Sequence, residues 1–197
     1  MGHMPETPGR PRDTTLDDRI LAATRDLLAE NGYQGLSIGA VARAAGTTRP
    51  SVYLRFTGKQ DLATRAIAGM NVPDELRTTK DIRADLIAEL AHFRTAVTRP
   101  NGMAFVGTVL AEERHTPELI EHFRDRLVRP RRRRVAGVLR RGMSDGTIRE
   151  DLDVDATTTM LIGSVYASYI AGGEVPADWP ERTVNSIWPA LTAGDGR

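Results

Sequence analysis

The sequence predicts an all-α protein of about nine helices. In almost every segment of the 197-residue chain, apolar residues recur at steps of three and four, the spacing of one face of a helix. No stretch alternates apolar and polar residues for long enough to indicate a strand. Hydroxyl or acidic residues precede the apolar periods, and Gly, Asn-Gly or Pro follows them, as is typical of helix starts and stops. We therefore expect helices alone to build the core.

The amino-terminal part is predicted to hold a flexible tail and a first helix. Residues 1–15 are polar, and residues 1–3, which precede a second methionine at Met4, resemble a cloning remnant. The first helix is expected from Leu16 to Asn31, because apolar residues form one stripe there and Asn31-Gly32 is a typical helix end. The stripe consists of Leu16, Ile20, Ala23 and Leu27.

Two short helices joined by a tight turn are expected next. Ser37 is placed to cap the first of them, and Gly46 permits the left-handed backbone conformation that a turn between helices requires. Thr47 or Thr48 then caps a third helix that runs to about Phe56. This is the spacing of a helix-turn-helix, in which the second of the two helices lies in the major groove of DNA.

The remaining chain is predicted to form longer helices. Thr57 and Gln60 have the pattern of a capping box, which starts a fourth helix. Pro130 is expected to kink the seventh helix. We place a domain boundary inside the fourth helix, which gives a small domain at 16–65 and a larger domain at 66–193. The helices of the larger domain are expected at about 79–98, 103–115, 117–143, 156–171 and 177–191.

Charge and composition restrict the classes of function. The net charge is +1, which argues against a protein that coats DNA through bulk electrostatics, so DNA binding would have to come from a local patch. The chain has no cysteine, which excludes disulfides, thiolate metal sites and a cysteine nucleophile. No apolar run approaches the ~18 residues of a membrane span, and the polar start lacks the apolar segment of a secretion signal. We expect a soluble, cytoplasmic protein that does not bind a membrane.

One local patch has the charge that DNA binding needs. Residues 31–60 contain no aspartate or glutamate but hold Arg43, Arg49, Arg55 and Lys59. On the predicted third helix, hydroxyl groups suit phosphate oxygens or base edges, and arginines suit guanine or phosphate. Each residue alone would equally suit a solvated helix face, so the prediction depends on the whole set. The hydroxyl and aromatic candidates are Thr47, Thr48, Ser51 and Tyr53, whereas Val52 and Phe56 are spaced to face inward.

This segment resembles the amino-terminal domain of TetR-family transcriptional repressors over about Leu16 to Ala68. The similarity lies in the stretches 31–38, 41–46 and 51–56, followed by Lys59 and Leu62. It implies a homodimer that binds a palindromic operator on double-stranded DNA, usually as a repressor, and that is released when a small molecule enters the larger domain. The DNA-facing residues that it implies are Ser37, Thr47, Thr48, Arg49, Pro50, Ser51, Tyr53, Arg55 and Lys59, and the charge pattern adds Arg43. Pro50 departs from the family, in which glycine is common at this position.

The last two helices favour dimerisation. Small residues lie on one side of the helix at 156–171, which would let a second helix approach closely. The last helix carries enough apolar area to join a helix-bundle interface about a two-fold axis. Packing within one chain would need the same features, so both interpretations stay open at this point. The predicted interface residues are Gly163, Ala167, Ala171, Val184, Ile187, Trp188 and Leu191.

An effector site is predicted in the larger domain around one apolar helix face. By steps of about 100° per residue, Glu113 falls within the apolar face that begins at Met103. A carboxylate there needs a partner, which is either a ligand or an internal arginine such as Arg94 or Arg126. Aromatic residues are candidate pocket walls, although they equally suit an ordinary core. The predicted set, for a mostly apolar effector, is Phe93, Met103, Phe105, Val109, Glu113, Phe123, Tyr166 and Tyr169.

Two other classes of function are considered. Helical bundles that hold two metal ions use inward-facing Glu-x-x-His pairs, and this chain has Glu89/His92 and Glu112/His115. Helical phase directs both histidines toward water, so we expect no catalytic residue, no metal site and no cofactor. The other class is a DNA binder that is controlled by a partner protein instead of a small molecule. The arginines between Arg129 and Arg141 would serve such a partner or contact DNA directly, or they form a solvated face laced with acids such as Glu121 and Asp125.

Overall fold

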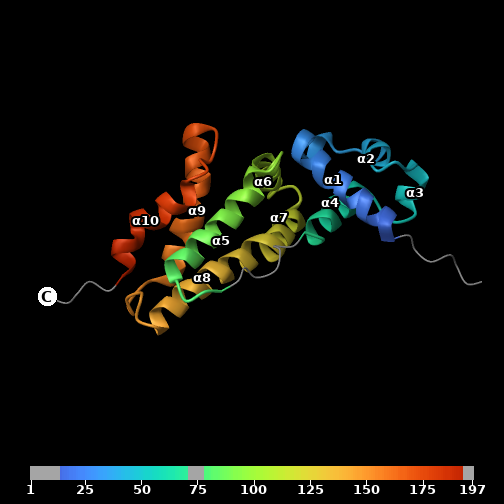
Figure 1. The fold of residues 1–197 in the computed structure, drawn as a ribbon. Coiled ribbons are helices and arrows are strands. Elements are labelled where there is room, and N and C mark those ends of the chain that lie inside the picture. The colour runs from blue at the N-terminus through green and yellow to red at the C-terminus, as the bar shows by residue number, and fades with distance from the viewer. Residues whose placement is uncertain (1–13, 71–77, 193–197) are drawn as a thin grey trace, which may run out of the picture.

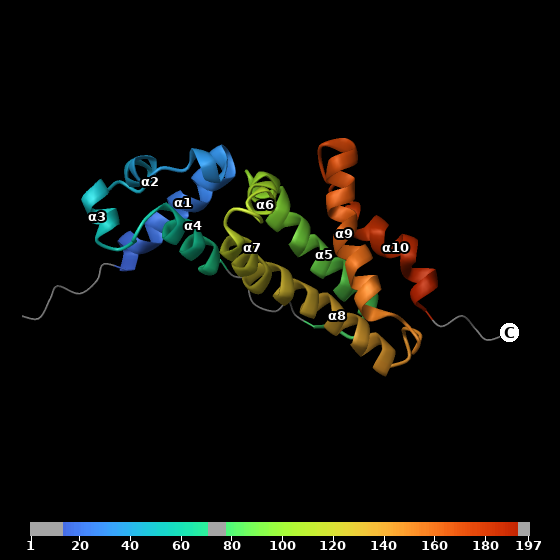
Figure 2. The same ribbon diagram turned by 180° about the vertical axis from the view of Figure 1, so that it is seen from behind.

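The computed structural model describes residues 14–70 and 78–192, and every regular element within these ranges is helical, which confirms the all-α prediction. Helices α1 to α4 form a small group at one end of the molecule, and α5 to α10 form a larger group at the other (Figures 1 and 2). The bounds are α1 Thr14–Gly35, α2 Ile38–Ala44, α3 Arg49–Tyr53, α4 Lys59–Ala68, α5 Ile82–Thr98, α6 Gly102–Ala111, α7 Pro117–Phe123, a π-helical segment Arg124–Val128, α8 Arg129–Ser144, α9 Val154–Gly172 and α10 Trp179–Leu191.

Local signals in the sequence set the shape of the small group as predicted. Gly32 interrupts α1 with non-helical angles, φ 67° and ψ 176°, so the regular part of the helix ends at Asn31. The Ser37 hydroxyl accepts a hydrogen bond from the Ala40 amide at 3.2 Å and caps α2. Gly46 has φ +64°, the left-handed conformation that the turn between α2 and α3 requires.

The capping box predicted for the fourth helix is wrong. Helix α4 begins at Lys59 with Gly58 as its cap, one residue later than the pattern indicated. The residue three positions after the cap is therefore Asp61, whose Oδ2 accepts the Thr57 amide at 2.9 Å. Gln60 is released from the capping role, and its Nε2 donates to Glu118 Oε2 at 3.4 Å.

The helix expected over 117–143 is a continuous helical run whose irregularity lies just before Pro130. The π-helical segment Arg124–Val128 separates α7 from α8. Proline has no amide hydrogen, and its ring collides with the carbonyl four residues earlier, which is Arg126. A wider π turn removes that collision without ending the helix. It also shifts the helical phase, so α8 presents different faces from those that a regular helix would give.

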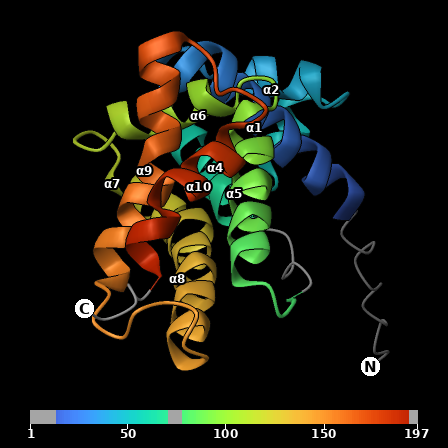
Figure 3. The same cartoon turned by 60° about the vertical axis from the view of Figure 1, so that its left-hand side comes forward.

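Buried apolar side chains form two clusters. The first joins α1 to α4 with α6 and α7, and it includes Phe105, Val109 and Phe123. The second joins α5, α8, α9 and α10, and α10 lies against both α5 and α9 (Figure 3). Helices α6 and α7, which follow the predicted domain boundary near residue 65, therefore pack against helices that precede it. That boundary stays a prediction.

Two ion pairs join α5 to α8. The Glu89 carboxylate faces the Arg134 guanidinium, with Oε2 2.9 Å from Nη2 and Oε1 3.1 Å from Nε. Both side chains are nearly buried, at 10% and 13% exposure. Asp85 pairs with Arg141 and also accepts hydrogen bonds from the amide and hydroxyl of Thr79. These pairs fix the relative position of α5 and α8, which both contribute to the cavity described below.

We expect Gly46→Ala to destabilise the protein by about 1 kcal/mol, because an L residue pays that much in the left-handed region. A Cβ on Gly46 would meet nothing within 4 Å, so the effect comes from the backbone alone. Gly137→Ala is the matched control, since its Cβ also meets nothing but its backbone is helical. There alanine should stabilise by up to about 1 kcal/mol. Urea unfolding measures the stability of both variants. Midpoint shifts of the same sign would contradict the left-handed conformation of Gly46.

Candidate DNA interface and internal cavity

Helix α3 lies at the end of the molecule farthest from α5 to α10 (Figures 1 and 2). Val52 and Phe56 are buried, at 0% and 3% exposure, and hold α3 in the first apolar cluster. The opposite side of the helix is exposed, and Tyr53 keeps 59% of its surface. The exposed residues of this face are Thr48, Arg49, Pro50, Tyr53 and Leu54, with Ser37 and Arg43 exposed on and beside α2. Thr47 and Ser51 are half-buried.

Arg49 leaves α3 across the backbone of α2. An ideal Cβ on Gly39 would lie 2.6 Å from Nη2 and 2.8 Å from Nε of Arg49. Any larger residue at position 39 would therefore displace the guanidinium. The absence of a side chain on Gly39 leaves room for Arg49 to lie along α2.

The hydroxyl groups of this face are already oriented by the helix starts. Thr48 Oγ1 accepts the Ser51 amide at 3.4 Å and lies 3.0 Å from Ser51 Oγ. Thr48 and Ser51 therefore support each other at the first turn of α3. Pro50 occupies the same turn, where its missing amide hydrogen costs nothing within the helix.

Arg55 and Lys59, two of the predicted DNA contacts, also bind within the chain. Arg55 Nε lies 2.7 Å from Asp17 Oδ1, and Arg55 Nη1 donates to the Ser51 carbonyl at 3.1 Å. Lys59 Nζ donates to the Gln34 carbonyl at 3.2 Å and lies 4.5 Å from the Tyr33 ring centroid. The partners Asp17, Tyr33 and Gln34 all belong to α1. Both cations therefore position the start of α4 and the end of α3 against α1.

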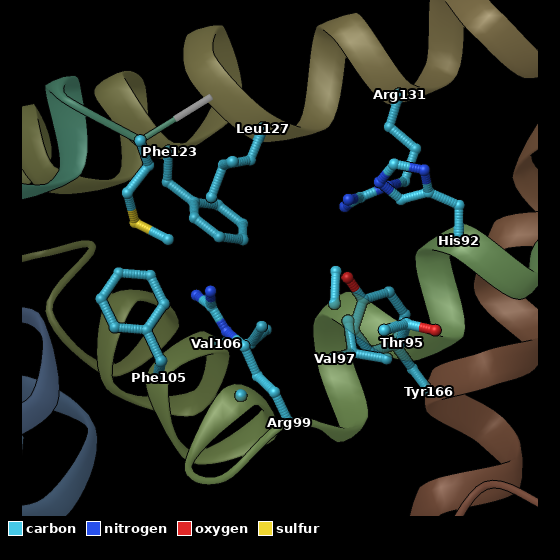
Figure 4. A pocket seen from close by; sticks show the side chains of 13 residues that line it. His92, Thr95, Val97, Arg99, Phe105, Val106, Phe123, Leu127, Arg131 and Tyr166 are labelled. Carbon is cyan, nitrogen blue, oxygen red and sulfur yellow. The ribbon is translucent and has the colours of Figure 1, made fainter. Parts of the chain in front are cut away.

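A cavity of about 310 Å³ lies among α5, α6, the π segment, α8 and α9 (Figure 4). An adjoining cavity of about 280 Å³ shares Val106, Phe123, Arg131 and Tyr166 with it. Four of the predicted pocket walls line these two cavities, namely Phe93, Phe105, Phe123 and Tyr166. The residues of the first cavity that the sequence reasoning missed are Met70, His92, Thr95, Ala96, Val97, Arg99, Gly102, Val106, Leu127 and Arg131.

The prediction for Glu113 is wrong. Its side chain is 54% exposed and pairs with Arg124 at 2.9 Å, whereas Glu112 is buried and accepts a hydrogen bond from Gln34 at 3.2 Å. The reason is that α6 ends at Ala111, so the helical phase does not extend to residue 113.

Three other predicted ligand contacts do not line the two cavities either. Val109 is fully packed in the first apolar cluster, at 1% exposure. Met103 and Tyr169 line a separate hollow near the turn between α5 and α6.

Three basic side chains line the first cavity, namely His92, Arg99 and Arg131. His92 is half-buried there, which corrects its predicted exposure to water; His115 is exposed as predicted. The pKa of His92 lies below its ordinary value, because burial disfavours the charged ring and Arg134 and Arg131 repel it. The Arg131 guanidinium lies 4.4 Å from the centroid of the Phe93 ring. Burial lowers the pKa of Arg131 to about 10, so it remains charged at neutral pH.

Most other arginines of α8 pair with acids of the same chain. Arg129 pairs with Asp125 and Glu121, and Arg132 pairs with Asp155. Arg134 and Arg141 pair with the α5 carboxylates Glu89 and Asp85, respectively. Arg133 and Arg140 are exposed. These pairs favour the interpretation of the arginine cluster as a solvated face laced with acids, from which Arg131 departs by pointing inward.

One face of α9 is apolar, rich in small residues and open to solvent. Ile170 keeps 82% of its surface and Met160 keeps 61%. By steps of about 100° these residues fall on one side together with the predicted interface residues Gly163, Ala167 and Ala171. Val184 and Leu191 require a correction, because they are buried in the chain's own second cluster at 0% and 3% exposure. Ile187 and Trp188 are half-buried against the same cluster.

Within residues 14–70 and 78–192, no group of three or more metal-ligating side chains comes together. Of the two Glu-x-x-His pairs, Glu89 forms an ion pair with Arg134, and Glu112 accepts a hydrogen bond from Gln34. In the same part of the chain, no helix combines the length and the apolar character needed to span a membrane.

Helices α1 to α4, with α2 and α3 joined at Gly46, define a helix-turn-helix DNA-binding protein that carries a second helical domain. Residues 20–66 match the family model of bacterial regulatory proteins, tetR family, and residues 76–187 match that of the tetracyclin repressor-like C-terminal domain. The chain belongs to the TetR family and is a DNA-binding transcriptional regulator.

Similar proteins agree with this assignment. The HTH-type transcriptional regulator YdeS of Bacillus subtilis is 29% identical over 191 residues, which cover 94% of each chain. The HTH-type transcriptional repressor KstR2 of Rhodococcus jostii is 28% identical over 187 residues, with 85% of each chain covered.

Two solved structures share the fold. A putative transcriptional regulator of Saccharomonospora viridis in complex with choline has a TM-score of 0.70 at 21% identity, over 89% of this chain and 96% of that one. FadR of Bacillus subtilis in complex with stearoyl-CoA has a TM-score of 0.64 at 19% identity, over 91% and 99%.

Proposed function

We propose that the protein is a homodimeric repressor that binds a palindromic operator in the cytoplasm and leaves it when a small molecule enters the cavity. The observation that carries this proposal is the exposed face of α3, which buried Val52 and Phe56 hold rigidly at the end of the molecule. Exposed Arg49 and Tyr53 on that face supply the groups that contact base edges and the DNA backbone. The similarity to a relative named as a repressor favours repression over activation.

The packing of α6 and α7 supports control by a ligand. Phe105, Val106 and Phe123 line the cavity and also belong to the apolar cluster that contains α1 to α4. A ligand that moved these side chains would therefore displace the apolar surface against which the DNA-binding helices pack. Polar contacts follow the same route, because Thr108 donates to the Leu28 carbonyl at 3.1 Å and Gln34 donates to Glu112.

The open face of α9 supports dimerisation. Met160 and Ile170 are large apolar residues that the chain itself leaves uncovered. Small residues between them would let the same helix of a second copy approach closely, and a two-fold axis would use this face twice. Two α3 helices placed about 34 Å apart would then meet successive major grooves on one side of the DNA.

We expect Ile170→Glu to raise the dimer dissociation constant at least tenfold, because a two-fold interface would bury two carboxylates without partners. Sedimentation equilibrium of the full chain measures the change. Leu54→Glu is the matched control, since Leu54 is 81% exposed, compared with 82% for Ile170, but lies beside α3. The control should remain as dimeric as the wild type. Dimerisation through α9 is contradicted if both variants associate equally.

Footprinting on the DNA that flanks the protein's own gene tests the proposed function. We expect one protected region with two inverted half-sites whose centres lie about one helical turn apart or a multiple of it. A protected region without two-fold symmetry would contradict the dimeric repressor, and protection of all flanking DNA alike would contradict a specific operator. The solved neighbours were captured with ligands of different charge, choline and stearoyl-CoA, so the effector of this chain has to be inferred from its own cavity.

A further inference from the structure

The linings of the two adjoining cavities contain several cations and no acid. The cations of the first lining are Arg99 and Arg131, and those of the second are Arg124, Arg131 and Arg132. His92 also lines the first cavity, but its lowered pKa disfavours the charged ring. Neither lining includes an aspartate or a glutamate in the part of the chain that the structure describes. In a chain whose net charge is only +1, this one-sided distribution is a local feature of the cavities.

Two of these arginines keep their charge available to the cavity. Arg124 pairs with Glu113 and Glu121, and Arg132 pairs with Asp155, so both are neutralised by acids outside the lining. Arg131 and Arg99 make no ion pair with any described residue. The acid on the neighbouring turn of α5, Glu89, is already held by Arg134 at 2.9 Å.

The two arginines enter the first cavity from different elements. Arg131 extends from α8, and Arg99 extends from the turn between α5 and α6, with the cavity between them (Figure 4). The Arg131 guanidinium also rests on the Phe93 ring at 4.4 Å, which fixes its position through a cation–π contact. The apolar part of the lining comes from Met70, Ala96, Val97, Phe105, Val106, Phe123 and Leu127.

Arg131 is half-buried and has no carboxylate partner among the described residues. Partial burial weakens the hydration of its charge, so an opposite charge in the cavity would be favourable. The lowered pKa of Arg131 is another consequence of the same burial. An anion in the cavity would accept charge-assisted hydrogen bonds from these arginines, and a planar carboxylate matches the paired N–H groups of a guanidinium. A cationic ligand would instead meet repulsion from Arg131 and Arg99 and find no acid to bind.

We propose that the cavity binds an amphiphilic carboxylate, with its anionic head between Arg131 and Arg99 and its apolar body against Phe105, Val106 and Phe123. The proposal rests on the function proposed above, in which this ligand is the effector. Its apolar body would occupy the side chains that belong to both the cavity and the cluster around α1 to α4. Contacts of the two arginines with the anionic head would select the class of ligand. Contacts with the apolar body would determine how far the DNA-binding helices are displaced.

Calorimetric titration of the full chain with three probes that share one alkyl chain tests the proposal. The probes are decanoate, decanol and decyltrimethylammonium. We expect decanoate to bind at least tenfold more tightly than decanol, because a charge-assisted hydrogen bond contributes at least that factor. Decyltrimethylammonium should bind more weakly than decanol. Equal affinities for the three probes, or tighter binding of the cation, would overturn the proposal.

Variants locate the anionic head. Arg131→Gln and Arg99→Gln should each weaken decanoate binding about tenfold or more and leave decanol binding nearly unchanged. Arg133→Gln is the matched control, because it removes an exposed arginine of the same helix α8. If Arg131→Gln fails to fold, the decanoate affinity of Arg99→Gln still tests the site, because Arg99 lies in an exposed turn. Decanoate affinities equal to wild type in both cavity variants would overturn the assignment.

Operator retention measured with the same probes separates this inference from the proposed function. Suppose that the wild type binds its operator specifically but binds the three probes with equal affinity. The proposed carboxylate site is then wrong, whereas the proposed DNA-binding function stands. If decanoate binds in the manner expected but the operator is retained at saturation, the site stands and release by this ligand is wrong.

Discussion

Replacing Arg49 and Tyr53 together by alanine should lower the affinity for the operator by on the order of a hundredfold and leave non-specific DNA binding nearly unchanged. A good side-chain contact to a base edge contributes about 1 to 3 kcal/mol of discrimination, and two such groups are removed. Both residues are exposed on α3, whereas Val52 and Phe56 hold the helix from the other side, so the variant should fold normally. Fluorescence anisotropy with the footprinted operator and a permuted duplex measures the change.

The control for this prediction is Arg133→Ala. It also removes one positive charge, but from the exposed surface of α8. Its operator affinity and the salt dependence of that affinity should match the wild type, because only arginines in contact with phosphate contribute to the salt slope. Equal losses of operator affinity in the double variant and in the control would indicate that net charge, and not the exposed face of α3, determines DNA binding.

Glu89→Gln should lower the free energy of unfolding by about 3 kcal/mol or more, the largest effect on stability that we expect from one substitution. The substitution keeps the shape of the side chain but removes the charge that faces Arg134 through two contacts, at 2.9 and 3.1 Å. With 10% and 13% of their surfaces exposed, the two side chains have little access to water. Urea unfolding monitored by circular dichroism measures the loss.

Two comparisons identify the cause of that loss. Glu121→Gln removes a carboxylate of similar geometry from an exposed pair with Arg124 and should leave the midpoint nearly unchanged. The double variant Glu89→Met, Arg134→Met should recover most of the stability, since it removes both charges of this pair and leaves neither without its partner. If Glu89→Gln has no larger effect than Glu121→Gln, the pair does not hold α5 against α8.

The sequence predicted the elements of the small domain well because short-range signals determine them. Ser37, Gly46 and Thr48 act within one turn of their own positions, and each has the role that its residue type indicates. The capping box failed for a related reason. A shift of one residue in the start of α4 transferred the capping bond from Gln60 to Asp61, and residue type alone does not fix such a shift.

The cavity was harder to predict, because helical phase holds only within a regular helix. Glu113 lies beyond the end of α6, so the count of 100° per residue no longer applies to it. Arg131 follows a π turn, which changes the face that it presents relative to a regular continuation of α7. Apolar periodicity at Val184 and Leu191 correctly indicates burial, but it does not state whether the covering surface belongs to the same chain or to a second copy.

The central claim is that the exposed face of α3 distinguishes one DNA sequence from another. The most direct test compares the affinity of the wild-type protein for the footprinted operator and for a duplex of the same length and composition in permuted order, at about 0.15 M salt. We predict a ratio of at least about a thousand, as is typical of specific DNA binding. Equal affinity for the two duplexes would contradict the claim.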